Sequence, residues 1–159
     1  MKYLLSVVRC TMLACLAVGV TASTAPGGDD TPPNWTGGGA GTTTPEGGVD
    51  VDEFSGRSSH VGQFIAEGFH ALNPVDFTFA GEATWTAANG DTLDVTYTGQ
   101  IFLSGDPVYP FGFVAELVAE GGTGRLSGAR GRAAMSGAFT GRPGEFYFDF
   151  EGTLDPNGK

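Results

Sequence analysis

Cysteine, cationic side chains and long apolar runs are all scarce in this sequence. Its 159 residues include two cysteines, and eight Lys and Arg stand against 18 Asp and Glu, which gives a formal charge of −10. So acidic a chain has no basic face with which to bind nucleic-acid phosphates or an anionic membrane. No run of about 20 apolar residues follows residue 25, so we expect no membrane span beyond it.

The short motifs of common catalytic and nucleotide-binding sites are also missing. No G-x-S-x-G segment is present, and Gly122-Thr123-Gly124 does not continue as G-x-G-x-x-G. The two histidines, His60 and His70, flank an expected strand, and their spacing does not bring them together. We therefore predict no metal and no cofactor, with one histidine hydrogen-bonded and the other exposed.

An acidic cluster of Asp50, Asp52 and Glu53 stands at the start of the expected folded region. Its dense oxygen ligands would suit weak calcium binding, but the spacing is not that of an EF-hand. A solvated run of charge is the preferred interpretation.

The first 22 residues have the layout of a secretory signal peptide. A positive start is followed by an apolar stretch from Tyr3 to Val20 and by small residues at the expected cleavage site after Ala22. A buried N-terminal helix and a lipoprotein site at Cys15 are the alternatives. Both cysteines lie here, so we predict a secreted protein, extracellular or periplasmic, that has no cysteine. Removal of Lys2 and Arg9 would take the formal charge from −10 to −12.

Residues 23–50 are rich in glycine, proline and threonine, which together account for 18 of 28 positions. A segment with so little apolar surface does not offset the entropy of ordering it. We therefore predict a disordered linker at 23–50. Trp35 is predicted to be solvated there, with docking onto the domain as the alternative.

From residue 51 to the end at 159, apolar and polar residues alternate with a period of two, which is typical of β-strands. Asn89-Gly90 between two such runs predicts a hairpin. Six strands are expected, over 61–69, 77–86, 93–103, 111–120, 133–139 and 146–154. Each has one aromatic-rich face, which favours an antiparallel barrel of six to eight strands over a sandwich.

Three stretches resemble a known family. Residues 121–131, GGTGRLSGARG, resemble the GGTG-x-F-x-x-A-x-G segment of dirigent proteins and the related turn of allene oxide cyclases. Residues 59–62, SHVG, and 86–91, TAANGD, resemble the upstream strand and hairpin of small secreted bacterial proteins thought to share that barrel. The resemblance covers about residues 54–154.

The resemblance implies a calycin-like barrel of eight antiparallel strands around a cavity, often trimeric in the plant members. Two features depart from the family: only six strands can be counted, and Leu126 replaces the usual Phe. The polar set of the cyclases has no residue-by-residue match. Pocket Asp and Arg residues of dirigent proteins have candidate counterparts in Asp94, Asp149 and Arg130, whose facing the sequence leaves open.

Aromatic residues on the presumed inner face suggest a binding lumen. Small residues alternate with them and would leave space unfilled, although aromatic side chains can also fill a small barrel completely. We predict a non-enzymatic protein that binds or shields a small apolar ligand. The lining residues would be Trp85, Tyr97, Phe113 and Phe148.

Two other functions stay open. Phe102, Val114 and Val118 on the outer face would suit a cell-surface module that packs against further copies of the chain. A cyclase- or dirigent-type enzyme would use Tyr97, or Asp94 and Arg130, as polar guides, and it is the least favoured reading.

Four arginines, Arg125, Arg130, Arg132 and Arg142, are either an anion-binding patch or members of cross-strand ion pairs. The second interpretation is preferred, with Glu145, Asp149 and Glu151 as partners.

Overall fold

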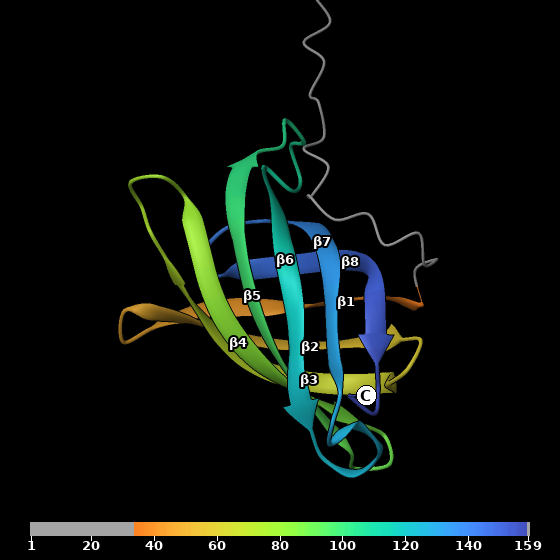
Figure 1. The fold of residues 1–159 in the computed structure, drawn as a ribbon. Helices are drawn as coiled ribbons and strands as arrows, with labels where there is room; N and C mark the ends of the chain where they lie inside the picture. The colour runs from red at the N-terminus through yellow and green to blue at the C-terminus, as the bar shows by residue number, and fades with distance from the viewer. Residues whose placement is uncertain (1–33, 159) are drawn as a thin grey trace, which may run out of the picture. The chain divides into compact units, whose positions relative to one another are not determined.

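The computed structural model describes residues 34–158 and shows an all-β chain whose single helical element is one 3-10 turn, η1 (Gly124–Leu126) (Figure 1). The strands are β1 (Trp35–Glu46), β2 (Val49–Ser58), β3 (Gly62–Leu72), β4 (Thr78–Ala87), β5 (Thr92–Leu103), β6 (Phe111–Gly122), β7 (Arg130–Phe139) and β8 (Gly144–Asp155). The last six are the six strands that alternation predicts.

Every strand pairs antiparallel with its neighbour along the chain, and β1 pairs with β8, so the sheet closes into an eight-stranded barrel. Trp35 lies opposite Gly152 in the closing pair. Beside it, the Asn34 side chain accepts from the Leu154 N–H at 2.8 Å and donates to the Leu154 carbonyl at 3.3 Å. Closure leaves no unpaired sheet edge.

The predicted disordered linker is wrong over residues 35–50, which form β1 and the start of β2. Residues 23–33 of that prediction, and the predicted signal peptide at 1–22, lie outside the described residues. Trp35 is fully buried rather than solvated. The glycines of β1 are ordered because rings from β8 lie over them: a Cβ on Gly37 would meet the Phe150 ring at 2.7 Å.

The two ends of the lumen differ. Aromatic and aliphatic side chains close the end at which β1 begins, where the ring of Trp85 stacks on that of Phe64 with centroids 4.3 Å apart. The fully buried side chains of this end include Trp35, Leu93, Leu126 and Leu154. At the opposite end, β7 and β8 are joined by a turn that carries Arg142, and charged side chains enter the lumen there.

Candidate functional site

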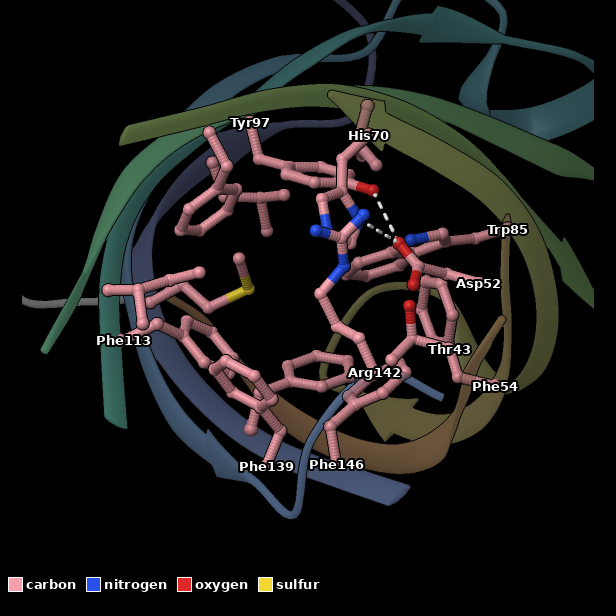
Figure 2. A pocket seen from close by; sticks show the side chains of 16 residues that line it. Thr43, Asp52, Phe54, His70, Trp85, Tyr97, Phe113, Phe139, Arg142 and Phe146 are labelled. Carbon is pink, nitrogen blue, oxygen red and sulfur yellow. Dashed lines mark hydrogen bonds and ion pairs between the residues drawn. The ribbon is translucent and has the colours of Figure 1, made fainter. Parts of the chain in front are cut away.

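The lumen contains a cavity of about 90 Å³ (Figure 2). This volume is well above the roughly 10–15 Å³ that one buried water needs. Its wall is largely aromatic and aliphatic, with a few polar side chains on one side. The lining residues are Thr43, Asp52, Phe54, His70, Phe79, Trp85, Val95, Tyr97, Ile101, Phe113, Leu117, Met135, Phe139, Arg142, Phe146 and Phe148.

All four residues predicted to face the lumen, Trp85, Tyr97, Phe113 and Phe148, line this cavity. Alternation is sufficient to place them, since each belongs to a strand whose inner and outer faces differ clearly. The polar part of the wall was not among the predicted lumen residues, apart from Tyr97.

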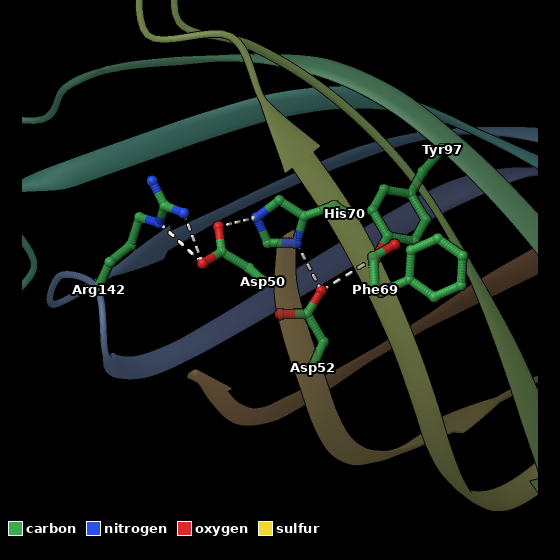
Figure 3. A network of polar contacts seen from close by, with 6 residues as sticks. All are labelled: Asp50, Asp52, Phe69, His70, Tyr97 and Arg142. Atoms are coloured by element: carbon green, nitrogen blue, oxygen red, sulfur yellow. Dashed lines mark hydrogen bonds and ion pairs between the residues drawn. The ribbon is translucent and has the colours of Figure 1, made fainter. Parts of the chain in front are cut away.

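That polar part belongs to a cluster of five side chains, Asp50, Asp52, His70, Tyr97 and Arg142, here called the polar cluster (Figure 3). Arg142 donates from Nε and Nη2 to Oδ1 of Asp50, at 2.9 and 2.7 Å. Nδ1 of His70 lies 2.7 Å from Oδ2 of Asp52, to which Tyr97 donates its hydroxyl at 3.0 Å. Nε2 of His70 is 3.2 Å from Oδ2 of Asp50, an ion-pair distance without the alignment of a hydrogen bond.

Strand register brings the polar cluster together. Asp50 lies directly opposite His70 in the pair β2–β3, and Asp52 is on the same inner face of β2 because the side-chain period of a strand is two. Gly81 of β4 lies opposite both His70 and Tyr97. Its missing side chain leaves room for both, since a Cβ there would meet His70 Cβ at 2.6 Å and the Tyr97 ring at 2.8 Å.

Opposite charges meet inside the polar cluster. The Asp50 side chain is fully buried, and Arg142 compensates its carboxylate by donating two hydrogen bonds to one of its oxygens, Oδ1. His70 places a ring nitrogen toward each carboxylate, and only the imidazolium form has an N–H on both nitrogens. Burial, and next the Asp52 carboxylate, raise the pKa of the Tyr97 phenol above its ordinary value. Tyr97 is therefore a neutral donor at physiological pH.

The preferred interpretation of the acidic cluster, a solvated run of charge, is wrong for two of its three residues. Asp50 and Asp52 are not a solvated charge run: they are 0% and 6% exposed, because they continue the inward row of β2. Glu53 points outward, so the three acidic side chains do not converge on a calcium ion. Within residues 34–158, no group of three or more metal-ligating side chains has the geometry to hold a metal ion.

The histidines also differ from the expectation. His70 is hydrogen-bonded, as predicted for one of the two histidines, but His60 is half-buried rather than exposed, and its Nε2 is a buried atom with no hydrogen-bond partner.

Asp94 and Arg130 lie outside the cavity. Asp94 is exposed on β5 and accepts a hydrogen bond of 2.9 Å from the Thr84 hydroxyl. Arg130 is exposed and donates to the Ala129 carbonyl at 2.7 Å. The neighbours of each residue along its strand face the lumen, so the side chains of Asp94 and Arg130 point outward. Neither residue can act as a polar guide for a ligand in the lumen, the role that the sequence suggested.

Three of the four arginines form ion pairs, in line with the preferred interpretation. Their partners are not the predicted Glu145, Asp149 and Glu151. Arg125 pairs with Asp91, Arg132 with Glu116, and Arg142 with Asp50. Arg132 faces β6 rather than β8, and Arg142 lies in a turn that folds back over the lumen. The local sequence indicates neither of these two ion-pair partners.

The outer face carries part of the apolar surface that was predicted. Phe102 and Val114 are 48% and 51% exposed, and Val118 is half-buried. Among the described residues, no helix has the length and apolarity needed to cross a membrane.

Comparison of the chain with protein-family models, with curated proteins and with solved structures finds no match. The resemblance to allene oxide cyclases and dirigent proteins therefore rests on the sequence motifs alone.

Proposed function

We propose that this barrel binds a small, mainly apolar ligand in its lumen. The observation that carries the proposal is the cavity of about 90 Å³, whose wall is aromatic and aliphatic except on the side of the polar cluster. Ligand sites in proteins commonly combine an apolar wall with a few placed polar groups. The four aromatic residues predicted from alternation would form part of this binding wall.

Apolar burial supplies enough free energy for measurable binding. A ring that loses about 150 Å² of apolar surface gains roughly 4 kcal/mol before the costs of association are counted. Taken alone, this gross gain corresponds to a dissociation constant of about 1 mM; the costs of association weaken the binding, and added polar contacts strengthen it.

Calorimetric titration with ethylbenzene tests the proposal. Met135 lines the cavity, so Met135→Trp should fill it and abolish the binding heat. Ser136→Trp places the same ring on the outer face of the same strand and is the matched control, expected to bind as the wild type does. Equal binding to both variants, or no binding to the wild type, would refute the lumen as the site.

The exposed apolar surface of Phe102 and Val114 favours a second function, in which copies of the barrel associate through β5 and β6. Light scattering tests it. A mass above that of one chain, reduced by Val114→Lys, would support association. A mass of one chain at high protein concentration would contradict this second function.

We further propose that the chain is exported, with cleavage after Ala22, and that its motifs reflect kinship with the allene oxide cyclase and dirigent barrels. Support for the kinship is that the barrel has the eight strands which the resemblance implies. The mass of the protein recovered outside the producing cytoplasm tests export, since cleavage after Ala22 has a defined mass.

A further inference from the structure

Asp52 places an unpaired carboxylate oxygen on the cavity wall, where its side chain is 8% exposed. Its Oδ2 atom accepts from Tyr97 and lies 2.7 Å from Nδ1 of His70. Its Oδ1 atom has no hydrogen-bond partner within residues 34–158, and Figure 3 shows it turned away from both neighbours. Oδ1 retains accessible surface, in contrast to Oδ2 of Asp50, which is buried as well as unpaired. It can therefore accept a hydrogen bond from a ligand in the cavity.

The charge of the polar cluster favours a cation at this oxygen. Among the cavity-lining residues of the described chain, Arg142 is the one permanently charged cation, and it donates two hydrogen bonds to Oδ1 of Asp50. Two ionised carboxylates and one guanidinium give the polar cluster a charge of −1 when His70 is neutral, and a protonated His70 brings it to zero. The polar cluster is positive in neither form. An anionic ligand therefore gains nothing from its overall charge.

Aromatic side chains lie next to Asp52 on the same wall. Phe54 is two residues further along the inner row of β2, and Tyr97 is hydrogen-bonded to Asp52. Both rings line the cavity. The face of an aromatic ring attracts a cation that lies within about 6 Å of its centroid, and the attraction grows as the cation loses water. A chain with a formal charge of −10 also attracts cations over a longer range. This part of the wall therefore suits an organic ammonium group.

We infer that the ligand of the lumen is an organic amine in its ammonium form, which donates an N–H to Oδ1 of Asp52 and has an apolar body. This inference rests on the proposed lumen binding and gives the ligand its chemical class. The apolar body would lie toward Phe113 and Phe139, which Figure 2 shows across the lumen from Asp52. Arg142 would stay on Asp50, so the ammonium group would not have to displace that ion pair.

Four probes that share one benzene ring test the class by calorimetry on the full chain: benzylammonium, ethylbenzene, benzyl alcohol and benzoate. The titrations are made at about pH 8, where an imidazole is ordinarily neutral and benzylamine is still protonated. Ethylbenzene has a methyl group where benzylammonium has its ammonium group, so this pair isolates the effect of the charge. We expect benzylammonium to bind at least tenfold more tightly than each of the other three probes.

Variants assign the effect to Asp52. Asp52→Asn keeps the shape of the side chain and removes its charge, so it should weaken benzylammonium at least tenfold and change ethylbenzene less than twofold. Asp94→Asn removes the same charge from an exposed position of β5 and is the matched control, expected to bind benzylammonium as the wild type does. Circular dichroism shows whether Asp52→Asn is folded. If it is not, the four probes on the wild type decide the class, and Met135→Trp, which should lose benzylammonium binding while Ser136→Trp retains it, places the probe in the lumen.

Four outcomes would overturn the inference. If ethylbenzene or benzyl alcohol binds as tightly as benzylammonium, the lumen binds a ligand but does not select an ammonium group. If benzoate binds most tightly, Arg142 rather than Asp52 sets the class. Equal benzylammonium binding by the wild type and by folded Asp52→Asn, or by Met135→Trp, would mean that the cavity carboxylate does not hold the amine. If none of the four probes binds, the proposed lumen function fails as well.

Discussion

The Tyr97 hydroxyl lies 3.0 Å from Oδ2 of Asp52, although β3 and β4 separate their strands in the barrel. The contact spans the inner face of the sheet. It is sterically open because Gly81, the β4 residue opposite Tyr97, has no side chain. Gly81 thus makes room for the hydrogen bond between Tyr97 and Asp52 without contributing a polar group to it.

Gly81→Ala should therefore disrupt the polar cluster. The added Cβ would meet His70 Cβ at 2.6 Å and the Tyr97 ring at 2.8 Å. Such overpacking costs about 1–3 kcal/mol, measurable as a lower free energy of unfolding in urea. Ala80→Ser adds one atom to an exposed position of the same strand and should change stability by less than about 0.5 kcal/mol. Equal stability of Gly81→Ala and the wild type would show that the strand shifts freely.

Alkaline pH should destabilise the protein through Tyr97. Burial and the Asp52 carboxylate raise the pKa of this phenol above its ordinary value of 10.0. Above pH 10 the unfolded chain releases the proton while the folded chain keeps it, so the stability present below pH 10 declines as pH rises. The slope from this one group is about 1.4 kcal/mol per pH unit.

Tyr97→Phe should remove that slope, as measured by urea unfolding between pH 9 and 11. Tyr147→Phe, on a half-exposed tyrosine of β8, is the control and should retain it. An alkaline slope in Tyr97→Phe equal to that of the wild type would mean that another group carries the effect.

Arg142 should contribute more to stability than the other paired arginines. Its partner Asp50 has a fully buried side chain, so Arg142→Met would leave a buried carboxylate whose remaining polar neighbour is the His70 ring. We expect a loss of about 2–3 kcal/mol, below the usual range for a buried pair because Arg142 is partly exposed. Arg132→Met breaks an exposed pair with Glu116 and should cost about 0–1 kcal/mol. Similar losses in both variants would contradict this assignment.

Trp35 should behave as a core residue. It is fully buried, donates to Ser58 and packs edge-on against Phe150 with ring centroids 5.2 Å apart. Trp35→Ala should lower the free energy of unfolding by about 3–5 kcal/mol. Trp35→Phe keeps the ring contact and should lose less. A near-neutral Trp35→Ala would support the solvated side chain that the local composition suggests.

Sequence reasoning recovered β3 to β8 because each has an apolar inner face and a polar outer one. It missed β1 and β2, since the inner positions of β1 are largely glycine and the inner row of β2 includes Asp50 and Asp52. The apolar surface that orders β1 comes from rings of β8, such as Phe148 and Phe150. That information lies about a hundred residues away along the chain and is not present in the local composition.

The aromatic wall could be predicted and most of the polar cluster could not. Asp50 and Asp52 look like surface charges, but they share the period-two row of Phe54, and this alternation was the available signal. Register alone places His70 beside them. Arg142 reaches Asp50 from a turn 92 residues later, which no local pattern indicates.

Native mass spectrometry of the protein purified from the cells that produce it tests the central claim most directly. The wild-type chain should carry a small molecule that denaturation releases, and Met135→Trp, with its lumen filled, should not. Ser136→Trp should carry it as the wild type does. A bare chain mass in the wild type, or the same bound mass in Met135→Trp, would contradict a ligand held in the lumen.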